Sequence, residues 1–156
     1  MKDTEIIKYV NFLSISMPKH KKLHIYTDGG CRGNPGPGAI GIVIFDDKGN
    51  IIVEHKECVG ETTNNRAEYA AVIRALEIAS GLCRNEISCF LDSQLVVKQM
   101  SGFFGIKKRE LLEFFHILKD RERAFVKVTY NFRKRTNKHI QRADKLVNEA
   151  LNNNYK

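Results

Sequence analysis

Long apolar runs are missing from this sequence. No stretch of its 156 residues approaches the roughly 20 apolar residues that a membrane-spanning helix needs. The first 17 residues are interrupted by Lys8 and Asn11 and lack a small-residue cleavage pattern, so they make a poor signal peptide. Internal repeats and low-complexity stretches are absent too. We therefore expect a protein without membrane association, formed by one domain with a real core.

The cysteines are poorly spaced for a metal site. The four cysteines, at positions 31, 58, 83 and 89, form no C-x-x-C pair. That spacing argues against zinc. Without a secretion signal, the four side chains are expected to be reduced thiols in a cytoplasmic protein.

Two common phosphate-binding motifs fail on closer reading, although residues 26–45, YTDGGCRGNPGPGAIGIVIF, are rich in glycine. Residues 36–41 spell G-x-G-x-x-G, but that motif binds a dinucleotide only where the third glycine opens a helix. Here the chain continues as a β-branched, strand-like run. A P-loop is excluded because no Lys-Ser/Thr pair follows Gly38.

Positive charge is concentrated in one segment. The net charge is +8, and residues 107–142, with 12 Lys/Arg and 4 Asp/Glu, carry all of it. A local basic excess is typical of a protein that binds a polyanion. The alternative is a solvated helix face with no partner.

The pattern of apolar residues, turn residues and helix caps predicts an α/β protein with a mixed sheet and helices packed on its faces. The expected order is β-β-β-α-β-α-α-β-α. The predicted strands are 23–28, 39–47, 50–59, 86–92 and 126–132, and the predicted helices are 63–81, 93–102, 107–123 and 142–153.

Four acidic residues occupy positions suited to a common site. Asp28 and Asp92 each end a predicted strand, Glu68 lies in the first turns of the long helix, and Asp144 lies near the start of the last one. Ligands of open α/β sheets bind outside the carboxyl ends of the strands, so the four would meet if the two strands are parallel neighbours. Converging carboxylates repel one another unless cations neutralise them, and oxygen ligands suit Mg²⁺ or Mn²⁺.

Each acid also has a structural alternative. Asp28 and Asp92 could be turn residues at strand ends, and Asp92 could cap the helix that follows it. Glu68, three residues after Asn65, could complete a capping box. Asp144 could interact favourably with the dipole of its helix. The four together, beside a glycine-rich segment and a basic segment, favour a functional site.

Four blocks of the sequence, YTDGGCRGNPGPGAIG, TTNNRAEYAAVIRALE, LDSQLVVKQM and RADKLVNEAL, resemble consecutive blocks of type 1 ribonuclease H, the ribonuclease HI family. The resemblance covers residues 22–152 and leaves an N-terminal extension over residues 1–21 and a C-terminal tail over residues 153–156. It implies the ribonuclease H-like fold, a five-stranded mixed sheet with an antiparallel second strand and helices on both faces.

The resemblance implies an endoribonuclease that hydrolyses the RNA strand of RNA–DNA hybrids. Two divalent metal ions, Mg²⁺ with Mn²⁺ as the alternative, would take part, and the products would carry 5′-phosphate and 3′-hydroxyl ends. A monomer is expected. The family's catalytic and metal-binding quartet falls on Asp28, Glu68, Asp92 and Asp144, with Asp28 as the bridge between the two ions.

The resemblance also implies residues that contact the substrate. The glycines would let the backbone approach nucleic acid closely, because they have no Cβ, and the polar side chains would read the 2′-hydroxyls that separate RNA from DNA. These residues are Gly29, Gly30, Cys31, Asn34, Asn64, Asn65 and Gln94, with Thr63 and Arg66 as further candidates for backbone contact.

The sequence departs from the family pattern in two places. The basic handle that many members use to grip the DNA strand is too short here, and only Lys107, Lys108 and Arg109 remain. A mobile basic residue before the last aspartate assists product release in the family, and Arg135 and His139 are both candidates for this role. In this respect the sequence resembles handle-less relatives of the archaeal type, some of which also cut double-stranded RNA.

Three other functions stay open at this point. One is a relative that acts on double-stranded RNA with weak hybrid activity. Another is a non-catalytic nucleic-acid-binding module, which loss of a quartet acid would favour. The third is a DNA-directed nuclease of the same fold, such as a resolvase or transposase.

Overall fold

A computed structural model of the chain describes residue 5, residues 18–103 and residues 105–154. The five strands and four helices of these ranges follow the predicted order. They are β1 (His20–Cys31), β2 (Gly36–Asp46), β3 (Ile51–Thr62), α2 (Asn64–Ala79), β4 (Cys83–Leu91), α3 (Gln94–Met100), α4 (Arg109–Glu122), β5 (Lys127–Phe132) and α5 (Lys138–Asn154).

Most of the predicted N-terminal extension lies outside the described residues, and its last two positions, 20 and 21, already belong to β1. The first two positions of the predicted C-terminal tail belong to α5, and residues 155 and 156 lie outside the described ranges.

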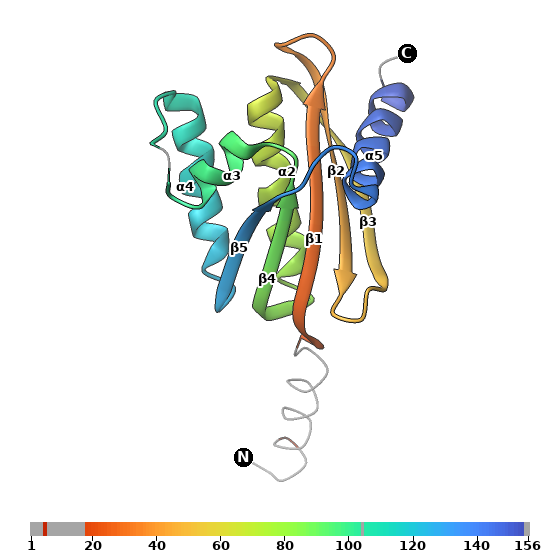
Figure 1. The fold of residues 1–156 in the computed structure, drawn as a ribbon, viewed down its shortest axis with the longest axis vertical. Coiled ribbons are helices and arrows are strands. Elements are labelled where there is room, and N and C mark those ends of the chain that lie inside the picture. Colours follow the sequence, from red (N-terminus) through yellow and green to blue (C-terminus); the bar gives the residue numbers. More distant parts are fainter. Residues whose placement is uncertain (1–4, 6–17, 104, 155–156) are drawn as a thin grey trace.

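The sheet has the strand order β3-β2-β1-β4-β5. β2 is antiparallel to both of its neighbours, β1 and β3, whereas β1, β4 and β5 run parallel to one another. This confirms the predicted five-stranded mixed sheet. β1 is therefore the central strand, and its carboxyl end lies beside that of β4 (Figure 1).

Helices cover both faces of the sheet, as predicted (Figure 1). In β2, Ile40, Ile42 and Ile44 belong to the core shared with α2, whereas Val43 and Phe45 pack with Ala143 and Leu146 of α5. Successive side chains of a strand point to opposite faces, so both faces of β2 are buried. This double burial explains why β2 reads as an almost continuous apolar run.

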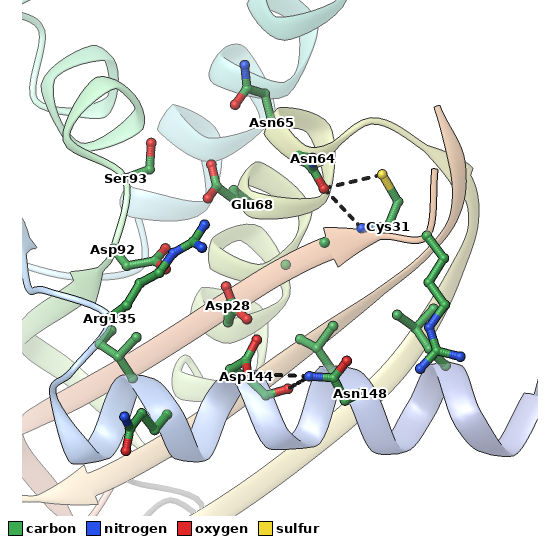
Figure 2. A pocket seen from close by; sticks show the side chains of 17 residues that line it. Asp28, Cys31, Asn64, Asn65, Glu68, Asp92, Ser93, Arg135, Asp144 and Asn148 are labelled. Atoms are coloured by element: carbon green, nitrogen blue, oxygen red, sulfur yellow. Dashed lines mark hydrogen bonds and ion pairs between the residues drawn. The ribbon is translucent and has the colours of Figure 1, made fainter. Parts of the chain in front are cut away.

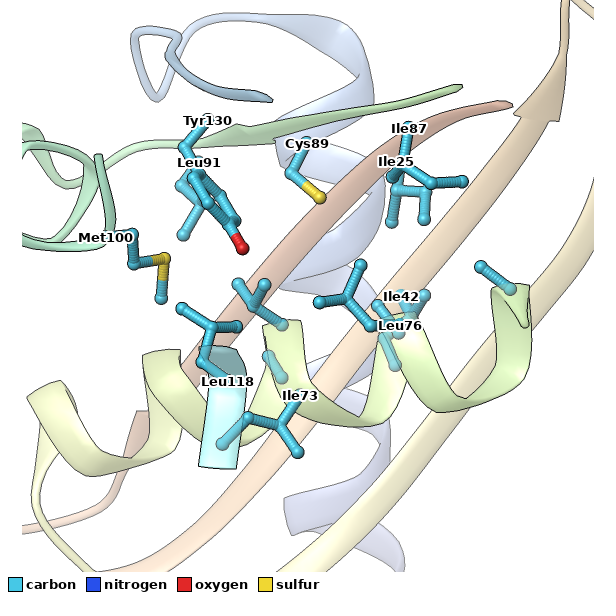
Figure 3. Close-up of a cluster of buried hydrophobic side chains, with 14 of the residues drawn as sticks. Ile25, Ile42, Ile73, Leu76, Ile87, Cys89, Leu91, Met100, Leu118 and Tyr130 are labelled. Atoms are coloured by element: carbon cyan, nitrogen blue, oxygen red, sulfur yellow. The ribbon is translucent and has the colours of Figure 1, made fainter. Parts of the chain in front are cut away.

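The main core lies between the sheet and the helices α2, α3 and α4 (Figure 3). Alanine, leucine and isoleucine of α2 face the strands, and α4 contributes Leu118 from outside. The largest side chains with almost no exposure include Leu23, Ile25, Tyr69, Leu76, Ile87, Met100 and Leu118.

The glycine-rich segment is mostly strand. β1 continues three residues past Asp28, and a connection of residues 32–35 leads into β2, closed by a hydrogen bond from Arg32 N to Pro37 O of 2.9 Å. A Cβ added to Gly29 would lie 2.3 Å from the carbonyl oxygen of Ala67 in α2. Close packing against the backbone of α2 therefore requires glycine at position 29, and its contact with nucleic acid stays a prediction.

The last helix begins at Lys138, earlier than the predicted start at residue 142. The side chain of Asn137 caps it, since Asn137 Oδ1 accepts hydrogen bonds from His139 N (2.9 Å) and Ile140 N (3.2 Å). Asp144 is thus the seventh residue of α5 and lies beyond the first turn, where the helix dipole acts on charges. The dipole does not explain why an acid stands at this position.

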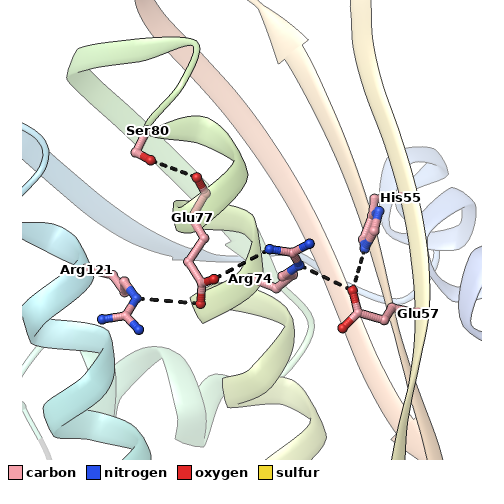
Figure 4. Close-up of polar contacts among 6 residues, drawn as sticks. All are labelled: His55, Glu57, Arg74, Glu77, Ser80 and Arg121. Carbon is pink, nitrogen blue, oxygen red and sulfur yellow. Dashed lines mark hydrogen bonds and ion pairs between the residues drawn. The ribbon is translucent and has the colours of Figure 1, made fainter.

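A polar network joins the edge strand β3 to α2 and α4 (Figure 4). Arg74 Nε of α2 lies 3.2 Å from Glu57 Oε1 of β3, and Arg121 Nε of α4 lies 3.5 Å from Glu77 Oε1 of α2. These partly exposed pairs contribute at most about 1 kcal/mol each. None of the helices in the described ranges combines the length and hydropathy that a bilayer span requires.

Candidate active site

The four predicted acids line one pocket of about 630 Å³ at the carboxyl ends of β1 and β4 (Figure 2). Tyr26 pairs with Phe90 across these parallel strands, so Asp28 and Asp92, each two residues further on, leave the sheet at the same level. α2 adds Glu68, and α5 adds Asp144. The predicted convergence is therefore present in the structure.

Burial and the neighbouring acids raise the pKa values of two carboxyl groups in the site. The pKa of Asp28 is raised to about 8, first by burial, then by the charge of Asp92, and by a hydrogen bond with Asp144 and the charges of Asp144 and Glu68. Burial and the charge of Asp92 raise the pKa of Glu68 to about 7, against the opposing effect of Arg135. A site that raises the pKa of two carboxyl groups so far favours the entry of positive charge.

The set of donor atoms fits a hard divalent cation, because carboxylate oxygens are the ligands that Mg²⁺ and Mn²⁺ prefer. The arrangement is open: in the described part of the chain, no three His, Cys, Asp or Glu side chains are grouped to hold one ion. The guanidinium of Arg135 lies beside one of the acids, with Arg135 Nε 3.2 Å from Asp92 Oδ2.

The helices α2 and α3 start at the site, but Asn65 and Asp92 do not cap them. Ser93 caps α3, since its Oγ accepts a hydrogen bond from Val96 N (3.2 Å). Thr63 caps α2, since its Oγ1 accepts one from Arg66 N (3.3 Å). Asp92 is therefore not a helix cap, and Asn65 is not the cap of a capping box with Glu68.

Three of the predicted substrate-contact residues, Cys31, Asn34 and Asn64, form a hydrogen-bonded cluster. Cys31 and Asn64 line the pocket of the acids, and Asn34 lines a neighbouring pocket. Asn64 Oδ1 accepts hydrogen bonds from Cys31 N (3.1 Å) and Cys31 Sγ (3.3 Å). Asn34 Oδ1 accepts one from Asn64 N (3.2 Å). These bonds commit both amide oxygens within the protein, so they leave the two NH₂ groups to act as donors toward a ligand.

The other predicted contact residues are spread more widely. Gly29, Gly30 and Asn65 line the pocket with the acids. Gln94 is the exposed first residue of α3 and does not belong to the residues that line this pocket. Thr63 and Arg66 line a neighbouring polar pocket together with Asn34, Asn64, Asn65, Lys108, Glu110 and Leu111.

The two auxiliary candidates lie in different places. Arg135 reaches the pocket and pairs with Asp92. The ring of His139 packs instead between Tyr26 (centroids 4.8 Å apart) and Phe45 (4.4 Å), and it does not line the pocket of the acids. Burial, together with two neighbouring cationic side chains, lowers the pKa of His139. The structure thus brings only Arg135 to the acidic site.

Sequence reasoning missed two polar residues of α5 in the pocket, Gln141 and Asn148. Asn148 Nδ2 donates hydrogen bonds to the carbonyl oxygen (3.1 Å) and the carboxylate Oδ2 (3.3 Å) of Asp144 (Figure 2). Both lie three or four residues from Asp144, the spacing that places side chains on one face of a helix. That spacing is the signal that could have found them. Ser93 and Arg32 also line the pocket.

Known proteins similar to this chain include ribonucleases of one family. The family model "RNase H" matches residues 20–152. The ribonuclease HI of Halobacterium salinarum is 39% identical over 135 residues, which are 83% of this chain and 64% of the relative. A bifunctional protein of Mycobacterium tuberculosis is 37% identical over 131 residues, and the match spans only 35% of its length.

Solved structures agree with these matches. The crystal structure of RNase H1 from Halobacterium salinarum has a TM-score of 0.81 at 37% identity, covering 85% of this chain and 98% of that one. LC11-RNase H1 in complex with an RNA/DNA hybrid has a TM-score of 0.75 at 42% identity, covering 86% and 99%. The predicted fold is confirmed.

Proposed function

Because the chain belongs to the ribonuclease H family, we propose that it is an endoribonuclease that hydrolyses the RNA strand of RNA–DNA hybrids. The family is one of nucleases, which are hydrolases, and this is the enzyme class that the sequence predicted. The observation that carries the proposal is the convergence of Asp28, Glu68, Asp92 and Asp144 in one pocket.

The four carboxylates would hold two divalent cations, Mg²⁺ or Mn²⁺. When bound, such ions activate a water molecule and stabilise the leaving oxygen of an in-line displacement at phosphorus. Asp28 is surrounded by the other three acids and would be shared between the ions, whereas Asn148 holds the carboxylate of Asp144 in place. We expect products with 5′-phosphate and 3′-hydroxyl ends.

Selection of RNA would depend on the amide groups at the rim of the pocket. The NH₂ groups of Asn34 and Asn64 are oriented by the bonds that their oxygens accept. Asn65 adds a third amide next to the acids. A 2′-hydroxyl accepts as well as donates hydrogen bonds, and it is the group that distinguishes RNA from DNA. The complex of the similar LC11-RNase H1 with an RNA/DNA hybrid supports this substrate.

The basic residues at the start of α4 support a polyanionic partner. Lys107, Lys108 and Arg109 are exposed, and none of them forms an ion pair within the described residues. Positive charges at the N-terminus of a helix are unfavourable, because the helix dipole is positive there. A bound phosphate backbone would remove this repulsion. These residues would therefore grip the hybrid in place of a full handle.

One assay tests the proposal. The protein is incubated with labelled RNA–DNA hybrid, double-stranded RNA and double-stranded DNA, each with Mg²⁺, with Mn²⁺ and with chelator. We expect metal-dependent cleavage of the RNA strand of the hybrid, with phosphatase-sensitive 5′ ends, and none by Asp28→Asn.

Four results would contradict it. Cleavage only of double-stranded RNA, or only of DNA, would assign the chain to one of the alternative substrates. Full activity of Asp28→Asn, or binding of the hybrid without cleavage by the wild-type protein, would remove the catalytic role of the quartet.

A further inference from the structure

Arg135 and Asp92 form an ion pair between very unequal partners. Their closest atoms, Arg135 Nε and Asp92 Oδ2, are 3.2 Å apart, yet the Arg135 side chain is 89% exposed and the Asp92 side chain only 11%. Figure 2 shows the guanidinium directed into the space between Asp92 and Glu68. The carboxylate is thus fixed in the pocket, whereas the cation reaches it from solvent.

The backbone that carries Arg135 is held at both ends. On one side Arg133 N donates to Leu91 O (2.8 Å), and the Arg133 guanidinium lies over the ring of Phe90 at 4.7 Å. On the other side Asn137 caps α5, and its N donates to Lys134 O (2.9 Å). Movement of Arg135 away from Asp92 therefore needs only a change of side-chain rotamer, with no rearrangement of this connection.

We propose that Arg135 is the displaceable counter-ion of the metal-free site: its guanidinium neutralises Asp92 and must leave this carboxylate when a divalent cation binds there. The inference rests on the proposed function, since it takes the quartet as the cation site. Two positive charges cannot share one carboxylate at full strength, so the ion pair and the bound cation compete.

The ion pair between Arg135 and Asp92 therefore lowers the affinity of the site for cations, and it stabilises the metal-free protein. The exposed partner limits the strength of the ion pair, which sets the expected gain in cation affinity on removing it at about fivefold, or about 1 kcal/mol. Without a cation, the same removal leaves Asp92 unpaired among the other carboxylates and lowers the free energy of unfolding.

The test compares cation binding by three forms of the full chain. Titration calorimetry with Mn²⁺, and separately with Mg²⁺, is applied to the wild type, to Arg135→Gln and to Lys134→Gln. Lys134 is the matched control, because it is the next residue of the same connection, is exposed and forms no ion pair in the described part of the chain. Its substitution removes the same charge without touching Asp92.

We expect Arg135→Gln to bind Mn²⁺ about fivefold more tightly than the wild type, and Lys134→Gln to stay within about twofold. In chelator, Arg135→Gln should unfold at lower urea concentration than Lys134→Gln. Equal cation affinities in the two variants would overturn the inference while leaving the proposed cation site intact. If none of the three proteins binds either cation, the cation site of the proposed function fails, and this inference with it.

Discussion

Replacing Asp28 by asparagine should stabilise the metal-free protein, and the gain should grow with pH. Asp28 has a pKa of about 8 in the folded protein against an ordinary value of 3.8, chiefly because it is buried. Between these two values the folded protein binds more protons at this site than the unfolded chain. The contribution of this carboxyl group to the free energy of unfolding is therefore largest at acidic pH and falls as the pH rises toward 8. The asparagine side chain of the variant cannot ionise, so this loss disappears.

The magnitude follows from the two pKa values. Between pH 5 and pH 7 the wild type should lose about 1.4 kcal/mol per pH unit relative to Asp28→Asn. At pH 7 the free energies of unfolding of the two proteins should differ by at most about 4 kcal/mol. This is an upper limit because the acids of the site titrate as a coupled set, so the neighbours of Asp28 take up part of the effect of its charge. A divalent cation should reverse the order, since it stabilises the folded wild type by binding to it.

Urea unfolding of both proteins in chelator, at pH steps from 5 to 8, measures this difference. Asp46→Asn is the matched control of opposite sign. Hydrogen bonds from Asn50 hold the pKa of Asp46 below its ordinary value. Its replacement should therefore destabilise the protein by an amount that stays constant from pH 5 to pH 8, because this carboxyl group is ionised in both the folded and the unfolded protein over that range. A stability difference between Asp28→Asn and the wild type that does not change with pH would refute the reasoning.

Two further pairs of substitutions separate structural from functional roles. Gly29→Ala should lower the free energy of unfolding by about 3 kcal/mol or more, because its Cβ would lie 2.3 Å from Ala67 O. Gly30→Ala should change this free energy little, because the atom nearest to its Cβ would be 3.8 Å away. Thermal unfolding of both variants measures the difference. Thr63→Ala should cost about 1 kcal/mol as the loss of a helix cap. Asn65→Ala should keep its stability and lower kcat/KM on the hybrid; the reverse result would make Asn65 a structural residue.

The order of strands and helices could be read from the sequence because each element carries its own local signal. Apolar alternation and β-branched residues mark the strands, and glycine or asparagine marks the ends of helices. The grouping of Asp28 with Asp92 followed from one general rule about the carboxyl ends of parallel strands. These inferences need no knowledge of which side chains meet.

The contacts between side chains could not be predicted from the sequence, because they depend on the folded arrangement and not on local signals. Nothing near Asn137 in the sequence separates it from other asparagines as the cap of α5, so the start of that helix was placed four residues late. The roles of Arg135 and His139 depend on which way a short connection turns its side chains. Only the folded chain shows that one reaches Asp92 and the other packs between Tyr26 and Phe45.

Two glycines relate the packing of the fold to the geometry of the site. Gly29 follows Asp28 and meets the carbonyl of Ala67, the residue before Glu68. Gly41 pairs with Asp28 across the sheet and meets the carbonyl of Ala143, the residue before Asp144. At both places a Cβ would push a helix away from the sheet and carry an acid with it. The spacing of the carboxylates is therefore set by contacts between backbones, which have fewer ways to relax than contacts between side chains.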